Sequence, residues 1–344
     1  MRPTMADVAE YAGVSITTVS LVLNDKPGVS SQVRELVLRA ADQLGYQLPK
    51  RRTASNTTES KTITILHFAP PGTAPRSSVS GISALYMNGI QDYCQSQNVN
   101  WALIANYSEG DDRHVGYHLI EGERLDFDGL ILMEMPSDQS PLLHRLIQAE
   151  IPIVVLSREW THLPISLVSQ SHRQQANLAL DHLIELGHRK IAFLGRESER
   201  PYDWFQVRLE CYTERMTALG AFDPSLIAIG PGAGQATREL IARRPDVTAI
   251  FAINDRNACS AMRALRELGI DVPRQVSVIG LDDSTAPPPD FPALTTVAFP
   301  HYKVGYLGAE VLLRQIEDPE LLCSHILVQS RLVRRASCAQ PLAQ

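Results

Sequence analysis

The sequence is poor in cysteine, and its thiols are scattered. Its 344 residues include five cysteines, none of them in a CxxC pair: Cys94, Cys211, Cys259, Cys323 and Cys338. An odd number of dispersed thiols is typical of reduced, buried side chains and argues against a disulfide framework. The same spacing argues against a zinc site.

Catalytic motifs and long apolar runs are also absent. The chain has no GxSxG, HExxH or GK[ST] string, and its ten histidines are dispersed. The glycines within 230–234 lack GxGxxG spacing and indicate only a turn between a strand and a helix. No apolar run reaches the ~18–20 residues of a membrane span, and the first residues do not resemble a signal peptide. We therefore expect a cytoplasmic protein that is not an enzyme, with no cofactor, metal or membrane partner.

Charge is distributed unevenly along the chain. The net charge is −6, which by itself argues against binding to DNA. Residues 1–52 nevertheless carry seven Lys or Arg against five Asp or Glu, a net +2, which leaves −8 for the remainder. A mildly basic head on an acidic body limits DNA contact to the head.

The start of the chain predicts two short helices joined by a tight turn. Thr4 is in N-cap position with Asp7 three residues on, as in a capping box, and Gly13 supplies the turn that ends the first helix. Ser15 caps a second helix over 16–23. Such a pair is typical of a helix-turn-helix, whose second helix enters the major groove of DNA.

A third helix and a polar linker follow. The helix begins at Ser30 or Ser31 and ends at Gly45. Its apolar stripe predicts the residues that pack against the first two helices: Val33, Val37, Ala40, Ala41 and Leu44. Residues 47–61 contain almost nothing apolar, which predicts a linker.

From residue 62 the pattern alternates between strand and helix. Short β-branched or apolar runs predict buried strands over 62–68, 101–105, 128–133, 151–156, 165–168, 190–194, 225–229, 248–253 and 275–280. Helices are predicted over 81–98, 112–124, 139–149, 172–186, 205–219, 234–243, 256–268 and 303–317. This alternation is typical of a doubly wound α/β body with parallel sheets, and a length of about 270 residues favours two lobes.

The residues of the head match a known pattern in order and spacing. The matching strings are Asp7-Val8-Ala9, Ala12-Gly13-Val14-Ser15, Thr18-Val19-Ser20, Val22-Leu23-Asn24, Val29-Ser30 and Leu44-Gly45-Tyr46. Over residues 4–46 the chain resembles the all-α DNA-binding head of the lac-repressor and gal-repressor (LacI/GalR) family of transcriptional regulators.

This resemblance implies which side chains contact DNA. It implies base readout by Ile16, Thr17 and Leu21. It implies phosphate contacts by five polar residues: Thr4, Ser15, Thr18, Ser20 and Asn24. Since Leu21 cannot donate a hydrogen bond to guanine, readout there is expected to be apolar, against thymine methyl groups, or absent.

The linker departs from the family pattern. Relatives usually carry a leucine that wedges into the minor groove, but here Gly45-Tyr46 is followed by QLPKRRTAS, with no leucine at the corresponding place. A wedge needs a large apolar side chain, so residues 49–61 are predicted to be an atypical hinge. Lys50, Arg51 and Arg52 are expected to hold phosphates; the alternative is a solvated tether.

The resemblance continues through the body. It is clearest in FAIND at 251–255, ALRELGIDVP at 264–273, VSVIGLDD at 276–283 and LTTV at 294–297. It implies a two-lobed domain similar to periplasmic sugar-binding proteins, with three crossovers and a ligand between the lobes. The boundaries expected are 1–48 for the head and 62–336 for the effector-binding and dimerisation domain. Its first lobe is expected at 62–168 and 297–322, and its second at 169–296 and 323–336.

Polar residues follow buried strands at their carboxyl ends, where open α/β sheets bind ligands. Asn254 and Asp282 are such residues and, like Arg208, stand at positions where the resemblance implies effector contact. Ser157 is a fourth effector-binding candidate and stands where many relatives have Asp. Three alternatives stay open: Asp255 as the cap of the helix that follows, Asp282 as a turn residue, and Arg208 as a surface residue. Four aromatic residues either line a sugar-like ligand or belong to the core: Trp160, Tyr202, Trp204 and Phe205.

These features predict a sequence-specific DNA-binding repressor associated with the nucleoid. As a homodimer it would bind a near-palindromic operator, since one head reads only a half-site. A small polar effector, sugar-like or nucleoside-like, would bind between the lobes and gate the repressor. The alternative is a constitutive DNA-binding regulator whose effector pocket has degenerated.

Overall fold

The protein divides into a small helical head and a larger α/β body. The computed structural model describes residues 4–23, 29–44, 46, 61–68, 81–107, 127–135 and 137–342. Among these residues, one compact unit lies before residue 60 and the other begins at Lys61. The predicted helix over 112–124 and nearly all of the predicted hinge lie outside the described residues.

The head contains the three predicted helices, α1 (Met5–Ala12), α2 (Ile16–Leu23) and α3 (Ser31–Leu44). Thr4 and Asp7 form the expected capping box of α1, and Gly13 ends that helix at a φ of 62°, which glycine adopts without strain. The Ser30 hydroxyl accepts from the Val33 amide at 3.4 Å and so caps α3. Apolar residues of all three helices form the core of the head: Val8, Ala9, Ala12, Val19, Val22, Val37, Ala40 and Ala41.

Within the described ranges, no single helix has the length and apolar composition of a membrane span. The helices α1 and α2 reach that composition only when taken together, across a bend of 106°. Val8, Ala9, Val19 and Val22 account for much of this apolar character, and all four are buried in the core of the head.

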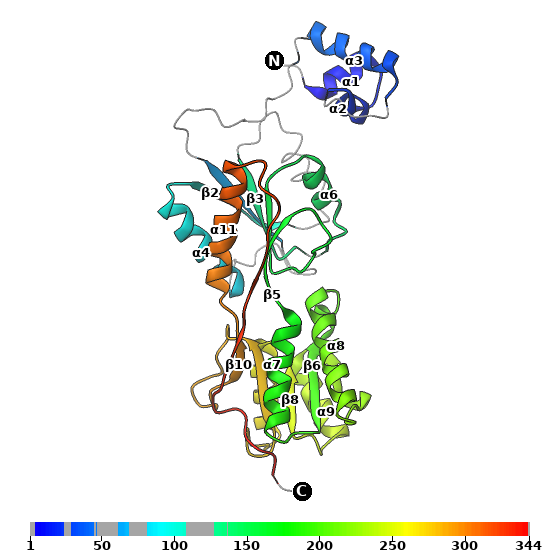
Figure 1. Ribbon diagram of the computed structural model, residues 1–344. Helices are drawn as coiled ribbons and strands as arrows, with labels where there is room; N and C mark the ends of the chain where they lie inside the picture. Colours follow the sequence, from blue (N-terminus) through cyan, green and yellow to red (C-terminus); the bar gives the residue numbers. More distant parts are fainter. Residues whose placement is uncertain are drawn as a thin grey trace. The chain divides into compact units, whose positions relative to one another are not determined.

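The first sheet of the body is parallel and runs in the order β11-β5-β4-β3-β1-β2. Its strands are β1 (Thr62–Phe68), β2 (Asn100–Tyr107), β3 (Gly129–Met133), β4 (Ile153–Leu156), β5 (Ser166–Gln170) and β11 (His325–Val328). Three helices accompany it: α4 (Ile82–Ser96), α6 (Pro141–Gln148) and α11 (His301–Glu317). The helices α4 and α11 lie side by side (Figure 1).

The second sheet runs in the order β12-β10-β9-β8-β6-β7, with only the β10–β12 pair antiparallel. Its strands are β6 (Ile191–Arg196), β7 (Ile227–Gly230), β8 (Ala249–Ala252), β9 (Ser277–Asp282), β10 (Thr295–Ala298) and β12 (Arg331–Val333). The helices are α7 (His172–Glu185), α8 (Asp203–Ala218), α9 (Ala233–Arg243) and α10 (Asp255–Glu267).

Alternate residues of β6 belong to different cores. Ala192 and Leu194 pack with α9 and α10, whereas Ile191 and Phe193 pack with α7 and α8. Because side chains alternate along a strand, helices cover both faces of this sheet. The predicted doubly wound α/β body is confirmed.

The sheets place the three crossovers later in the chain than predicted. The first sheet keeps β5 up to Gln170, and the second keeps β10 up to Ala298, so the first two boundaries shift by two residues. The third differs more, because β11 pairs with β5 and therefore belongs to the first sheet. The assignment of residues 323–328 to the second lobe is wrong; the chain crosses over between Val328 and Arg331.

Two glycines bring α4 and α11 into backbone contact. A Cβ placed on Gly89 would lie 2.0 Å from the Tyr302 carbonyl oxygen, and one on Gly305 would lie 2.0 Å from that of Tyr86. Any side chain at either position would push the helices apart. This contact fixes where Tyr86, one turn before Gly89, meets the start of α11.

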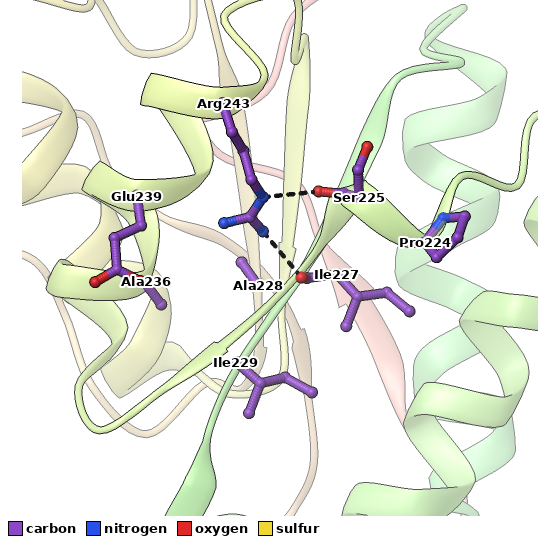
Figure 2. Close-up of a pocket in the computed structure, with 8 residues that line it drawn as sticks. All are labelled: Pro224, Ser225, Ile227, Ala228, Ile229, Ala236, Glu239 and Arg243. Carbon is purple, nitrogen blue, oxygen red and sulfur yellow. Dashed lines mark hydrogen bonds between the residues drawn. The ribbon is translucent and has the colours of Figure 1, made fainter.

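At the end of the second sheet, an arginine of α9 covers the edge strand β7. Arg243 donates from Nε to the Ser225 carbonyl at 3.1 Å and from Nη2 to the Ile227 carbonyl at 3.0 Å (Figure 2). A hollow of about 310 Å³ lies beside these contacts, lined by Glu239 and Arg243 among others. Free edge carbonyls are a template for pairing with another chain, and Arg243 occupies one of them, at Ile227, together with the Ser225 carbonyl in the turn just before β7.

Replacing Arg243 by alanine is therefore expected to promote self-association. We expect Arg243→Ala to form larger species than the parent in sedimentation velocity, and to aggregate faster on warming, because the Ile227 carbonyl of β7 and the Ser225 carbonyl just before it become free. The matched control is Arg238→Ala on the same helix, which removes only an exposed ion pair with Glu267. Equal association of the two variants would contradict the role given to Arg243.

Candidate functional site

The second helix of the head presents a small, largely uncharged outer face. Val19 and Val22 are buried in the core of the head. Thr17 is exposed and Leu21 half-buried on the other side of α2. Ile16 also packs partly against that core, so only part of its side chain is available to a base. The structure thus leaves Thr17 as the most accessible of the three predicted base-reading residues, with Leu21 and Ile16 each half-buried.

Three of the predicted phosphate-contacting hydroxyls are held at helix N-termini. Thr4 bonds with Asp7, and these bonds lower the pKa of the Asp7 carboxyl. Ser15 accepts from the Thr18 amide at 3.1 Å, and the two hydroxyls lie 2.8 Å apart. Amides at a helix start favour anions such as phosphate. Four further predicted contacts lie outside the described residues: Asn24, Lys50, Arg51 and Arg52.

In the body, Arg208 lies on α8 and is buried. Its guanidinium donates to the Ile253 carbonyl at 2.7 Å and to the Gln175 side-chain oxygen at 2.8 Å. A third contact joins it to Asp282 at 3.5 Å. Only 3% of Arg208 is exposed, so the alternative of a surface residue is wrong. A buried guanidinium has to be surrounded by acceptors, because removing its charge from water is costly.

Asp282, the last residue of β9, both ends the strand and contacts Arg208. Its φ of 101° and that of 53° at Asp283 turn the chain sharply after the strand. Its side chain is nevertheless buried against Arg208. The structure therefore brings two of the predicted effector residues together, and the turn is what directs Asp282 there.

Asn254 caps α10 and is tied to a buried carboxylate that the sequence did not reveal. Its side-chain oxygen accepts from the Asn257 amide at 2.9 Å, and its Nδ2 donates to Glu199 at 2.9 Å. Glu199 also accepts from Arg196 at 2.7 Å and from the Asn257 side chain at 2.8 Å. Burial raises the pKa of Glu199, but these donors outweigh it and hold that pKa below its usual value.

Asp255 is not the cap of α10; that alternative is wrong, because Asn254 takes the position. The Asp255 carboxylate instead accepts from the Ser284 amide at 2.7 Å and from the Thr296 hydroxyl at 2.6 Å. It thereby anchors the segment that follows β9. Burial and the nearby charge of Asp282 raise the pKa of Asp255 to about 7.

This raised pKa predicts a pH dependence of stability. Between the unfolded value of 3.8 and about 7, the folded state binds the proton that the unfolded state has lost, so stability falls as pH rises. Asp255→Asn removes this titration. We expect the variant to be less stable at every pH, because one acceptor is lost. Relative to the variant, the parent should lose about 2 kcal/mol between pH 5 and pH 8 in denaturant unfolding. Parallel pH profiles would contradict the assignment.

Ser157, the fourth predicted effector residue, is held in the first lobe. It follows β4 at a φ of 59°. Its hydroxyl donates to the Gln170 side-chain oxygen at 3.2 Å and contacts the hydroxyl of Tyr86. The structure shows no direct contact between the described side chains of Ser157 and Arg208. His172, at the start of α7, is near Arg208 and also near Arg158, the neighbour of Ser157 in the chain. Burial and the charges of these two arginines lower the pKa of His172.

Several buried polar atoms around Arg208 have no hydrogen-bond partner among the described residues. They are both ring nitrogens of His172, Nε2 of Gln175, Nε of Arg208 and Nε2 of His301. All four residues are at least 97% buried. An unpaired buried donor or acceptor costs about 1–3 kcal/mol, so such a group of atoms is typical of a site that a polar ligand completes. A single histidine at the start of a helix gives no sequence signal, so the sequence did not predict a role for His172 or His301.

The aromatic candidates divide between site and core. Phe205 is fully buried in the core of the second lobe, as the core alternative states. The Trp204 ring lies 5.2 Å from the Arg208 guanidinium and stacks on Tyr202 at 5.4 Å. Trp160 is buried and donates from its indole to Asp203 at 3.1 Å. None of these residues lines the hollow beside β7.

Comparison with known proteins agrees with both units. A family model for bacterial regulatory proteins of the lacI family matches residues 4–48, and one for a periplasmic binding protein-like domain matches residues 180–338. The transcriptional repressor PurR of Photobacterium profundum is 30% identical over 324 residues, which cover 92% of each chain.

Solved structures give the same result. The structure of a complex of the transcriptional regulator CelR with cellobiose is 30% identical, with a TM-score of 0.71 over 98% of this chain and 100% of its own. The lac repressor dimer bound to operator and an anti-inducer is similar in fold, with a TM-score of 0.66 at 24% identity, over 98% and 100% of the two chains.

A helix-turn-helix head on a periplasmic-binding-protein-like body defines a class of DNA-binding transcriptional regulators. The chain belongs to the lacI family of bacterial regulatory proteins. It is a DNA-binding transcriptional repressor, and because its relatives form a non-enzymatic family, the prediction that it is not an enzyme is confirmed.

Proposed function

We propose that the protein represses transcription as a homodimer on a near-palindromic operator and is gated by a small polar effector. The observation that carries the effector site is the group of unpaired, buried polar atoms around Arg208. A sugar-like molecule suits this group because hydroxyls both donate and accept; a nucleoside-like molecule is the second class. The complex of the relative CelR with cellobiose supports the first.

The proposed division of labour follows the two units. The head, up to about residue 48, reads a half-site through Thr17, Leu21 and part of Ile16. Residues 49–61 form the hinge, and Lys50, Arg51 and Arg52 within it add phosphate contacts. The two-sheet body binds the effector and dimerises. Arg208, Asn254, Asp282 and Ser157 take part in the effector site, and the protein acts in the cytoplasm, at the nucleoid.

Selection of bound DNA from a random pool tests operator recognition. We expect the full chain to enrich a two-fold symmetric motif. Thr17→Ala combined with Ser20→Ala should weaken binding to that motif by about tenfold or more, since base and phosphate contacts at α2 are lost. Leu38→Ala, at an exposed position of α3, is the control and should bind as the parent does. Unchanged affinity of the double variant would refute the placement of the reading helix.

A constitutive regulator with a degenerate effector site is the competing function. It is favoured by the fact that Arg208 and Asn254 already have protein partners. Titration calorimetry of the full chain against a panel of sugars and nucleosides separates the two. We expect at least one compound to bind with a Kd that Arg208→Lys raises about tenfold or more, because lysine cannot reproduce the planar guanidinium. Binding by no compound in the panel would favour the constitutive regulator.

A further inference from the structure

A chain of hydrogen bonds leads from the first sheet to a histidine at the start of α11. It runs from Gln170, at the end of β5, through Ser157 and Tyr86 to His301. The Tyr86 hydroxyl lies 3.0 Å from Nδ1 of His301. All four groups are buried or half-buried, so water does not compete freely for these bonds.

The direction of each bond follows from its end at Gln170. The Gln170 side-chain oxygen can only accept, so the Ser157 hydroxyl gives it its single hydrogen. Ser157 must then accept from Tyr86. Since Tyr86 donates its only hydroxyl hydrogen to Ser157, its oxygen accepts from His301, and Nδ1 of His301 carries the proton.

The other ring nitrogen of His301 is left as a bare acceptor. Burial lowers the pKa of His301 and outweighs the charge and the backbone carbonyl of Asp282, which raise it, so the imidazole is neutral at pH 7. With the proton on Nδ1, Nε2 has a lone pair and no proton. Nε2 has no partner among the described residues, and His301 is only 3% exposed. A buried lone pair of this kind is completed by a donor.

The neighbouring unpaired atoms have the opposite character. Gln175 uses its side-chain oxygen to accept from Arg208, so its free Nε2 is a donor, as is Nε of Arg208. The Arg208 charge is offset by Asp282. The neutral ring of His172 adds one donor and one acceptor to this group. Three donors and two acceptors without net charge suit a neutral molecule with several hydroxyl groups.

We propose that His301 is an effector-binding residue whose Nε2 accepts a hydrogen bond from a hydroxyl of a neutral, polyhydroxylated effector, and that Tyr86 positions it. This inference rests on the proposed function of the same site. The backbone contact of α4 with α11 at Gly89 and Gly305 supports it, because that contact fixes Tyr86 and the start of α11 relative to each other.

The tautomer of His301 is directly measurable. In long-range ¹⁵N–¹H correlation spectra of the full chain labelled at histidine, the His301 signals are assigned by their loss in His301→Gln. At pH 7 we expect a protonated Nδ1 and an unprotonated Nε2 in the parent, and a mixture of tautomers in Tyr86→Phe, since the phenyl ring no longer accepts. A protonated Nε2 in the parent would overturn the inference.

Binding of cellobiose, followed by calorimetry, tests the role of the acceptor. We expect the affinity to fall about tenfold or more in His301→Phe, which has no acceptor, and less in His301→Gln, whose side-chain oxygen can replace it. Tyr86→Phe should weaken binding and make it depend differently on pH. Tyr302→Phe is the control, because its exposed hydroxyl bonds to Asp92 on the outside of the helix pair.

Different results would refute the inference about His301 and the proposed function. If the parent binds cellobiose and His301→Phe binds it equally well, the inference is wrong and the proposed function stands. If the parent binds neither cellobiose nor any other compound of the sugar and nucleoside panel, the proposed effector site is wrong, and the role given to His301 with it.

Discussion

The buried guanidinium of Arg208 is the group on which the polar interior of the second lobe depends. A charge at this depth needs acceptors, and the fold supplies them from three separate elements: the Ile253 carbonyl after β8, the Gln175 side chain on α7 and the Asp282 carboxylate at the end of β9. Because the carboxyl ends of parallel strands meet at one edge of a sheet, the acceptors at the ends of β8 and β9 converge there, and the first turn of α7 adds Gln175.

Satisfying Arg208 leaves other polar atoms without partners. The side-chain oxygen of Gln175 accepts from Arg208, and its amide nitrogen has no partner among the described residues. His172 and His301, at the starts of α7 and α11, add further unpaired ring nitrogens. The helix α7 follows β5, and α11 follows β10. Each of these strands is the last one before the chain crosses to the other lobe. A ligand that bonds to these atoms would therefore act next to two crossovers, which is where a change in the relation of the lobes has to be absorbed.

The head was predictable from the sequence because its signals are local. Thr4 with Asp7, Gly13, and the serines before α2 and α3 each determine a helix end within four residues. The strands β1 to β9 were also predicted, since buried parallel strands are continuous apolar runs. The strands β10, β11 and β12 were missed because they are short and are defined mainly by their pairing with other strands; β4, β7 and β8 are as short as β10 and β11 but were predicted from their apolar runs.

The candidate site was only partly predictable for the same reason. The pairing of Arg208 with Asp282 joins residues 74 apart in the chain, and resemblance to a family pointed to both where periodicity did not. Glu199, His172 and His301 gave no signal, because a single polar residue beside a strand end looks like any other until the fold shows what surrounds it. The third crossover was misplaced because β11 resembles a loop except for its pairing with β5.

The most direct test of the account is the operator affinity of the full chain with and without its effector, in the parent and in Arg208→Lys. The account predicts that a sugar or nucleoside shifts the parent's operator affinity by about fivefold or more. It predicts that this shift disappears in the variant, whose effector-free affinity stays within about twofold of the parent because the head is untouched. A shift of equal size in Arg208→Lys would contradict the claim that the polar group around Arg208 controls the DNA-binding head.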